Sequence, residues 1–320
     1  AIRRRLKTKY KLRDAQAFTL LEALGRDCVG AVQLLPTDAP AVDVSVLKYK
    51  PLTATQMDTL LANLGTDQGP HADDEDDEDF RISIAGAQEK TALLRVDGQW
   101  AKPLHATPTT HILKPPIGIT PGKNLDLRLS SENEWLCSRI LNALGLPVAH
   151  SRVETFEHLR ALVVERFDRQ WMHRPPSQEG AELGAASGED RWLLRIPQED
   201  FCQALGSSGA RKYENDGGPG IQDCLQVLKG GVDYDGDARV FLLALLAFWL
   251  LAAIDGHAKN FSVFLLPGGK YRLTPLYDVM SAWPILDKGA HSLSYSKVKM
   301  AMALRGTRAH YKLGELLPRH

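Results

Sequence analysis

The sequence contains few cysteines, and none of them are clustered. Its 320 residues include four, at Cys28, Cys137, Cys202 and Cys224, and no Cys-x-x-Cys pair occurs. Disulfide frameworks and structural zinc sites need cysteines in close, repeated spacings, so we expect neither. Free cysteines fit a reducing compartment, and we therefore expect a cytoplasmic protein.

The sequence also lacks an excess of charge of either sign. Its 39 lysines and arginines balance its 39 aspartates and glutamates. Without net charge, no overall field draws the protein onto nucleic acid or an anionic membrane. We expect any contact with DNA to come from a local patch or from a partner protein, and we expect no membrane association.

No hydrophobic run is long enough to cross a bilayer. The longest, Val240 to Ile254, has 15 residues and is bounded by Arg239 and Asp255, whereas a membrane-spanning helix needs about 20. We predict a helix that is buried on all sides. The basic residues 1–5 are not followed by an apolar segment and do not predict a signal peptide. Because there is no initiator methionine, we expect the natural N-terminus to lie upstream.

What is present is the composition of an ordinary globular protein of about two domains, with 44% hydrophobic and 24% charged residues. Hydrophobic periodicity predicts a strand-rich first part and a mostly helical second part, an α+β fold. We place an N-terminal lobe at 1–167, with a subdomain at 1–65 and a core at 80–167, and a helical C-terminal lobe at 168–320. Helices are predicted at 14–24, 53–64, 130–144, 197–205, 221–229 and 240–254, and strands at 29–35, within 80–96, and at 111–116, 161–167, 261–266 and 272–276.

Two segments have the composition of surface loops. Residues 73–79 are consecutive acidic side chains, which predict a solvated, mobile loop, with metal capture as the alternative. Residues 172–190 are rich in Pro, Gly, Ser, Ala and Glu. We interpret them as a mobile surface insertion.

The pattern that carries the most chemistry follows the long apolar run. Asp255 and Asn260 have the spacing that protein kinases use between a catalytic Asp and a magnesium-binding Asn. A second acid, Asp278, follows after a hairpin turn at 267–269. Phosphoryl transfer from ATP needs a carboxylate that receives the proton of the attacking hydroxyl, and oxygen ligands for Mg²⁺. We therefore assign Asp255 as the base and Asn260 and Asp278 as the metal ligands.

The loop between the acid and the amide admits two interpretations. His257 and Lys259 could contact phosphate oxygens. Alternatively, Asp255 could cap a helix and His257 could be an ordinary core histidine. Several polar residues grouped after a long apolar helix, with a second acid beyond, favour the catalytic interpretation.

The first part of the chain offers weaker signals for a nucleotide. Lys114 ends an apolar strand, where a kinase places its phosphate-binding lysine, although such a lysine can simply be solvated. The loop Ala85–Lys90 could direct backbone N–H groups at phosphates, but its single glycine matches neither GxGxxG nor the Walker A pattern. Glu165–Phe167 is either a hinge whose backbone pairs with adenine or an ordinary strand end. Ser83 precedes the loop, and a phosphate there would disturb ATP binding.

These segments resemble the HipA family of serine/threonine kinase toxins from bacterial toxin–antitoxin modules. The resemblance runs through nearly all of the chain. It rests on the stretches RISIAGAQEKTALL (81–94), TTHILKPPIG (109–118), VVERFDR (163–169), LLRIPQEDFCQALG (193–206), KYENDGGPGI (212–221), DGHAKNFSVF (255–264) and YRLTPLYDVMSAWP (271–284).

The resemblance implies a bilobal protein-kinase-like fold, related to lipid-kinase-like enzymes, that uses ATP and Mg²⁺. It places the catalytic base at Asp255 and the magnesium ligands at Asn260 and Asp278. It makes Ser83 the autophosphorylated serine, where the phosphate expels the nucleotide loop and switches the kinase off. The implied ATP contacts are Ala85, Gly86, Ala87, Gln88, Glu89, Lys90, Lys114, Glu165, Arg166, Phe167, His257, Ala258, Lys259, Asn260, Tyr277 and Asp278.

The resemblance also implies partners and a cellular role. Toxins of this family pair with a HipB-like helix-turn-helix antitoxin and act as co-repressors, reaching operator DNA mainly through it. Their substrates lie in translation, with glutamyl-tRNA synthetase the leading one, and its phosphorylation causes growth arrest and drug tolerance. Family members extend further at both ends, so we expect a truncated C-terminus that lacks the DNA-contacting residues.

The sequence thus predicts a cytoplasmic, ATP-dependent serine/threonine protein kinase. The alternative is a catalytically idle partner that helps a DNA-bound antitoxin repress transcription. The complete set Asp255, Asn260 and Asp278 argues against idleness. A small-molecule or lipid kinase rests on analogy of fold alone.

Overall fold

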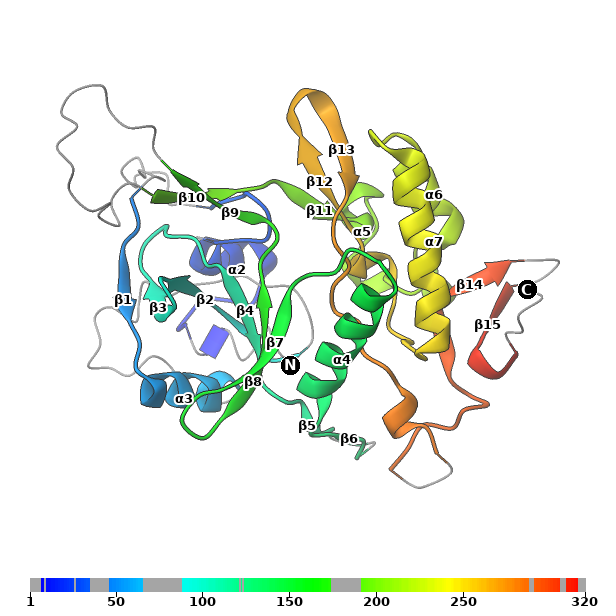
Figure 1. Ribbon diagram of the computed structural model, residues 1–320, viewed down its shortest axis with the longest axis horizontal. Helices are drawn as coiled ribbons and strands as arrows, with labels where there is room; N and C mark the ends of the chain where they lie inside the picture. The colour runs from blue at the N-terminus through cyan, green and yellow to red at the C-terminus, as the bar shows by residue number, and fades with distance from the viewer. Residues whose placement is uncertain are drawn as a thin grey trace. The chain divides into compact units, whose positions relative to one another are not determined.

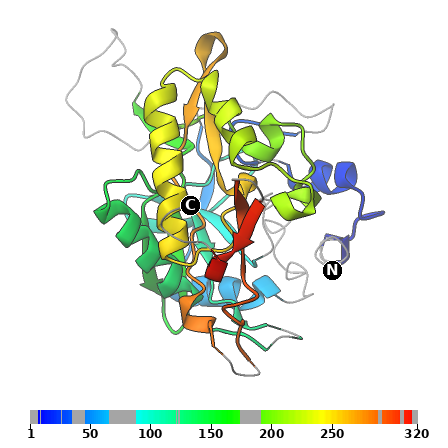
Figure 2. The same ribbon diagram turned by 90° about the vertical axis from the view of Figure 1, so that its right-hand side faces the viewer.

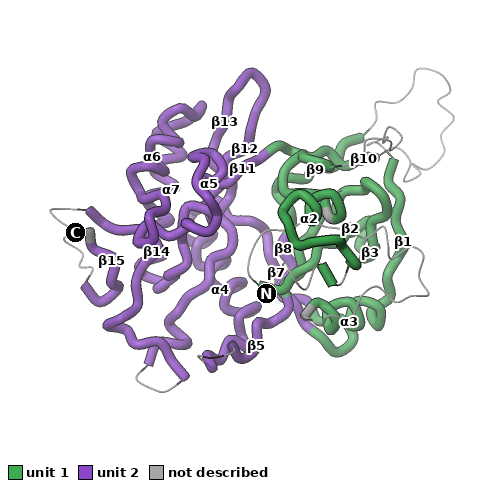
Figure 3. Tube along the Cα trace, turned by 180° about the vertical axis from the view of Figure 1, so that it is seen from behind, with its two compact units in different colours: residues 1–114, 155–159, 165–197 green, residues 115–154, 160–164, 198–320 purple. Residues whose placement is uncertain are grey.

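A computed structural model describes residues 7–8, 10–25, 27–34, 46–65, 88–120, 122, 124–173, 191–287, 291–305 and 309–315. Helices and strands are mixed along the chain, as the α+β prediction requires (Figures 1 and 2). Two compact units are present (Figure 3): the first comprises 1–114, 155–159 and 165–197, and the second 115–154, 160–164 and 198–320. The boundary predicted after residue 167 therefore falls within the last segment of the first unit.

The first unit is built on antiparallel strands. Four of them are adjacent in the order β1 (Tyr49–Pro51), β3 (Gln99–Pro103), β2 (Thr91–Val96) and β4 (His111–Lys114). Leu94 of β2 pairs with Ala101 of β3, and Thr91 of β2 pairs with Leu113 of β4. All four side chains are buried. Residues 91–94 are buried in succession, so both faces of β2 are covered, and the register is given by the hydrogen-bonded pairs rather than by an alternation of buried and exposed side chains.

Two helices and a hairpin complete the elements of this unit: α2 (Ala17–Leu24), α3 (Ala54–Ala62), and β9 (Arg169–His173) with β10 (Arg191–Arg195). The helices predicted at 14–24 and 53–64 are confirmed, the latter with a capping box between Thr53 and Gln56. The strand predicted at 29–35 is wrong, since residues 29–34 form turns and irregular chain. There, the Gly30 backbone bonds the side chains of Asp168 and Arg169 in place of a neighbouring strand.

A buried ion cluster joins this N-terminal segment to the chain around β9. Asp27 accepts hydrogen bonds from Arg166 at 3.1 Å and from Arg169 at 2.8 Å. Asp27 also accepts from Arg195 at 3.2 Å, and Asp168 accepts from Arg166 at 2.8 Å. No side chain of the five is more than 7% exposed. Burial favours the neutral acids, but the guanidinium groups outweigh it: they hold the pKa of Asp168 at about 2 and lower the pKa of Asp27.

The second unit contains most of the helical residues. Its helices are α4 (Ser130–Ala143), α5 (Phe201–Ala204), α6 (Ile221–Lys229) and α7 (Tyr234–Leu250). Strands β7 and β8 are assigned to this unit because most of their residues belong to it. The strands of the unit are β5 (Gly118–Ile119), β6 (Asp126–Leu127), β7 (Ser151–Thr155), β8 (Arg160–Glu165), β11 (Gln198–Asp200), β12 (Ser262–Leu266), β13 (Lys270–Leu273), β14 (Lys299–Arg305) and β15 (Ala309–Lys312). The β12–β13 hairpin was predicted, and β11 extends it into a three-stranded antiparallel sheet.

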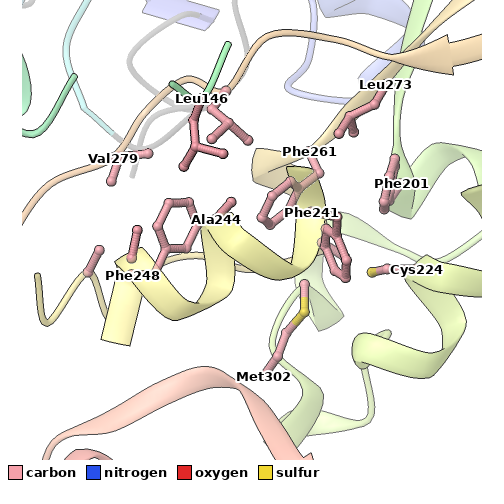
Figure 4. Packing of buried hydrophobic residues seen from close by; sticks show 14 of the residues in the cluster. Leu146, Phe201, Cys224, Phe241, Ala244, Phe248, Phe261, Leu273, Val279 and Met302 are labelled. Carbon is pink, nitrogen blue, oxygen red and sulfur yellow. The ribbon is translucent and has the colours of Figure 1, made fainter. Parts of the chain in front are cut away.

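Aromatic side chains form the centre of the second unit's core (Figure 4). Phe201, Phe241, Phe248 and Phe261 are at most 2% exposed. The rings of Phe241 and Phe261 are 4.8 Å apart at 70°, an edge-to-face arrangement that the ring quadrupoles favour. Because Phe261 directly follows Asn260, this core fixes one end of the polar loop in which the predicted catalytic residues lie.

The long apolar run forms α7, but its burial differs from the prediction. The helix begins at Tyr234, where the Asp233 side chain accepts from Gly236 N. One face is buried in the core, whereas the exposed fractions of four leucines lie between 42% and 58%: Leu242, Leu243, Leu246 and Leu250. The prediction of burial on all sides is wrong, since a uniformly apolar run cannot indicate which face packs. Among the helices that the structure describes, none has the length and hydropathy to cross a membrane.

Replacing Asp27 with alanine tests the buried cluster. We expect the free energy of unfolding to fall by about 3–5 kcal/mol, because buried guanidinium groups lose their shared counter-charge. Urea denaturation of both proteins measures the change. The control is Asp126→Ala at the exposed Asp126–Arg128 pair, which should leave stability almost unchanged because water screens that pair. Equal effects at the two positions would contradict the role of the cluster.

Candidate functional site

A buried turn directs the chain from α7 into the predicted catalytic loop. Ala253 N donates to Phe248 O at 2.7 Å and Ala252 N donates to Trp249 O at 3.1 Å, with Ala252 at φ +49°. This is the Schellman pattern, whose left-handed position is usually glycine. Ala252 is fully buried, so packing holds it in this conformation. Asp255 therefore lies beyond the end of the helix, and the alternative that it caps a helix is wrong.

The turn from Asp255 to Asn260 is closed by two hydrogen bonds to one carbonyl. Asp255 O accepts from His257 N at 2.8 Å and from Asn260 Nδ2 at 2.9 Å. Gly256 has no alternative here, because a Cβ atom would lie 2.4 Å from the Phe248 ring. With Nδ2 committed to the turn, Asn260 Oδ1 accepts no hydrogen bond from any residue that the structure describes.

The second acid follows a tyrosine that binds the same turn. Tyr277 OH donates to Lys259 O at 3.1 Å, so its contact with Ser262 Oγ at 2.7 Å has the serine as donor. Asp278 has φ +61°, a left-handed conformation that aspartate tolerates better than most residues but that still costs energy. Such strain is concentrated at functional sites. The hydrogen bond of the preceding Tyr277 to Lys259 O connects this part of the chain to the turn.

Helix α4 and the end of α7 hold the chain that follows Asp278. Asn133 of α4 donates through Nδ2 to Ser281 O at 2.8 Å and accepts from Ser281 N at 2.9 Å. Ser281 Oγ donates to Leu251 O at 2.6 Å, and Ala282 N donates to Ala252 O at 3.0 Å. Three segments distant in sequence are therefore fixed to one another by bonds to backbone groups.

His257 is buried without a hydrogen-bond partner for its ring. Its side chain is 3% exposed, and neither ring nitrogen bonds a described residue. Burial lowers the pKa of His257, against the opposing effect of Asp255, whose Oδ1 lies 3.6 Å from Nε2. Buried polar groups in folded proteins nearly always have a partner. A ring that bonds no described residue and lies 3.6 Å from the Asp255 carboxylate therefore fits a site that receives a polar ligand.

Lys259 is engaged by an acid from the neighbouring sheet. Its Nζ lies 2.5 Å from Asp200 Oδ2, while Asp200 Oδ1 caps α5 by accepting from Gln203 N at 3.0 Å. The ion pair thus connects the predicted catalytic loop to β11 and α5. The sequence predicted that Lys259 contacts a phosphate. In that case the ammonium group of Lys259 would have to bind the phosphate and the Asp200 carboxylate together.

One residue of the site was missed by sequence reasoning. Tyr213 donates its hydroxyl to Asp255 Oδ1, and Lys212 Nζ lies 3.9 Å from the same oxygen. The Tyr213 ring also lies edge-on to His257, with centroids 5.2 Å apart at 77°. The segment KYENDGGPGI contains Tyr213, but nothing in its residue types indicates a contact with an acid 42 positions away.

Those predicted nucleotide contacts of the first unit that the structure describes lie on β-strands or beside them. Gln88–Lys90 lead into β2, and Lys114 is the last residue of β4 and is 5% exposed. Glu165 ends β8 exposed and Phe167 is half-buried, whereas the guanidinium of Arg166 belongs to the buried ion cluster and has a structural role. Outside the described residues lie Ser83, Ala85, Gly86, Ala87, the acidic run 73–79 and residues 174–190.

The residues of the second unit have the donor chemistry that Mg²⁺ prefers. Asn260 Oδ1 and the Asp278 carboxylate are hard oxygen ligands, and magnesium takes the rest of its ligands from phosphates and water. Within the described ranges, no three His, Cys, Asp or Glu side chains form a metal-binding cluster. The two oxygens and the unpaired His257 together fit a nucleotide phosphate with its cation.

Comparisons with known proteins agree with this fold. A protein of Sinorhizobium fredii that is named as a kinase, Y4mE, is 36% identical to this chain over 278 residues. The aligned region covers 85% of this chain and 60% of Y4mE. The serine/threonine-protein kinase toxin HipA of Shewanella oneidensis is 28% identical over 282 residues, 82% of this chain and 56% of HipA. One chain in the solved complex of Shewanella oneidensis MR-1 HipA with HipB and operator DNA has a similar structure, with a TM-score of 0.68 and 25% sequence identity to this chain. The superposition covers 94% of this chain and 64% of that chain.

This chain therefore spans between 56% and 60% of the length of these two curated relatives. A protein-family model, the HipA-like C-terminal domain, matches residues 82–317. That range contains every predicted site residue, including the turn from Asp255 to Asn260. The chain belongs to the HipA-like C-terminal domain family.

Proposed function

We propose that this protein is an ATP- and Mg²⁺-dependent serine/threonine protein kinase, the toxin of a type II toxin–antitoxin module. The observation that carries the proposal is the Asp255 turn, in which an exposed carboxylate and the amide of Asn260 are joined through one backbone carbonyl, while Asp278 directly follows Tyr277, which binds the same turn. The similarity to a HipA named as a serine/threonine-protein kinase toxin supports the same activity.

Asp255 acts as the general base. Its side chain is 57% exposed, so the hydroxyl of a serine or threonine on another protein can reach it. The carboxylate accepts a hydrogen bond from that hydroxyl, orients its oxygen and takes its proton as the bond to phosphorus forms. The bond between the γ-phosphoryl group and the rest of the nucleotide breaks, and ADP is the leaving group.

The remaining residues position the nucleotide and its cation. Asn260 Oδ1 and Asp278 would hold Mg²⁺, and His257 can direct a ring N–H at a phosphate oxygen. When bound, Mg-ATP supplies the γ-phosphoryl group, and the cation offsets its developing charge. Tyr277 holds the backbone of Lys259 in the turn. In the first unit, Lys114 and residues 85–90 are the proposed phosphate contacts, and Glu165–Phe167 the proposed adenine contact.

The partners are proposed from the family. The Shewanella HipA was solved with HipB and operator DNA, and we propose a HipB-like helix-turn-helix antitoxin for this protein, with operator DNA reached mainly through it. The proposed substrate is a translation component in the cytoplasm, glutamyl-tRNA synthetase, whose phosphorylation would cause growth arrest and drug tolerance. A catalytically idle co-repressor is the competing function, and its effect on growth would not depend on Asp255.

Replacing Asp255 with asparagine tests the proposed activity. We expect transfer of labelled phosphate from Mg-ATP, to the protein itself and to glutamyl-tRNA synthetase, to fall by about 100-fold or more, because the base is lost. Growth arrest on expression should disappear with it. The control is Asp235→Asn, an exposed acid in the first turn of α7, which should keep full activity. Transfer retained by the Asp255 variant, with its melting temperature unchanged, would refute the proposed base.

Ser83 is the proposed regulatory site. After incubation with Mg-ATP, peptide mass spectrometry should detect phosphate on Ser83, and not in the Asp255→Asn protein. A phosphoserine carries a charge of about −1.5 to −2 at neutral pH, which beside the nucleotide loop should weaken ATP binding. Ser83→Ala should therefore remain active after long incubation, while the wild-type protein loses activity. An unmodified Ser83 in an active preparation would count against this regulation.

A further inference from the structure

We propose that Tyr213 is a positioning residue for phosphoryl transfer, holding one oxygen of the Asp255 carboxylate so that the other is presented to the acceptor hydroxyl. The inference rests on the proposed function, because it takes Asp255 as the base. It adds a residue from a separate segment of the chain to the catalytic machinery.

The contacts of the two carboxylate oxygens are unequal. Oδ1 accepts from the Tyr213 hydroxyl and lies 3.9 Å from Lys212 Nζ and 3.6 Å from His257 Nε2. Oδ2 accepts no hydrogen bond from any residue within the described ranges. An exposed aspartate without such contacts would sample several rotamers. The three groups gathered at Oδ1 select one of them and leave Oδ2 for the substrate.

The Tyr213 hydroxyl is suited to act as a donor. Burial, followed by the hydrogen bond to Asp255, raises the pKa of Tyr213. The hydroxyl therefore keeps its proton at neutral pH. It donates a hydrogen bond to the Asp255 carboxylate, and because the acceptor is charged this is a charge-assisted hydrogen bond. The ring is fixed by its edge-on contact with His257 and by the Lys212 ammonium group, which lies 5.1 Å from the ring centroid.

The segment that carries Tyr213 is anchored by its neighbour, Glu214. The buried Glu214 carboxylate accepts from Ala303 N at 2.7 Å and from Arg305 Nε at 2.9 Å, both in β14. Tyr213 O accepts from Gly218 N at 2.9 Å, which folds the glycine-rich segment back on itself. Tyr213 is thus held from both sides, as a group that must orient a catalytic side chain within a fraction of an ångström requires.

Replacing Tyr213 with phenylalanine removes the hydroxyl and keeps the ring. At saturating Mg-ATP, we expect the rate of autophosphorylation to fall by about 10- to 100-fold, because the base loses its orientation. The apparent KM for ATP and the affinity for ATP should not change, since Tyr213 is not among the nucleotide contacts. A merely structural loss would instead lower the melting temperature or alter both kinetic parameters.

Tyr271→Phe is the matched control. This substitution also removes one tyrosine hydroxyl from the second unit. The Tyr271 hydroxyl donates to the backbone oxygen of Val227 at 2.7 Å and not to a carboxylate. Its rate should equal that of the wild-type protein. In the double variant Tyr213→Phe/Asp255→Asn, the rate should equal that of Asp255→Asn alone, because Tyr213 acts only through Asp255.

The outcomes separate this inference from the function on which it rests. If Asp255→Asn is inactive while Tyr213→Phe retains the wild-type rate, the positioning role is overturned and the kinase proposal stands. A faster Tyr213→Phe protein would also overturn it, because the hydroxyl would then obstruct the carboxylate. If Asp255→Asn retains activity, the proposed base and the positioning role both fail although the protein is a kinase. If the wild-type protein transfers no phosphate, the kinase proposal fails, and this inference fails with it.

Discussion

Two hydrogen bonds to the carbonyl oxygen of Asp255 hold the candidate site together. Because His257 N and the Asn260 side chain both donate to this oxygen, the backbone of Asp255 and the amide of Asn260 cannot move independently. Gly256 places the turn directly against Phe248, in contact too close for any side chain. The aromatic core of the second unit therefore determines where the backbone of the turn lies.

Around this turn, polar bonds bring together segments that are far apart in the sequence. Tyr277 reaches the carbonyl of Lys259, and Asn133 of α4 bonds the backbone of Ser281 in both directions. Tyr213 reaches Asp255 from a segment that Glu214 anchors to β14. Each bond uses a side chain to fix a backbone or a catalytic group, which is how a protein positions a site more precisely than packing alone allows.

The buried ion cluster of the first unit and the Asp255 turn of the second differ in how far their polar groups are engaged by other residues. In the first unit, Asp27 and Asp168 are saturated by guanidinium groups, so this cluster connects chain segments and leaves no acid for chemistry. At the turn of the second unit, Asp255 remains exposed, and neither nitrogen of the buried His257 ring bonds a residue that the structure describes. The Arg166 side chain belongs to the ion cluster of the first unit, so a nucleotide contact proposed for residues 165–167 would have to use the backbone.

Local features of the sequence determined much of this protein. The spacing of Asp255 and Asn260, the glycine between them and the turn at 267–269 are short-range patterns, and they predicted the catalytic loop and the hairpin after it. Only the tertiary structure decided which face of α7 is exposed, that residues 29–34 are not a strand, and that Tyr213 bonds Asp255. Those outcomes depend on contacts between residues up to 139 positions apart, such as Gly30 with Arg169. No local periodicity encodes such contacts, because they form only when the chain has packed.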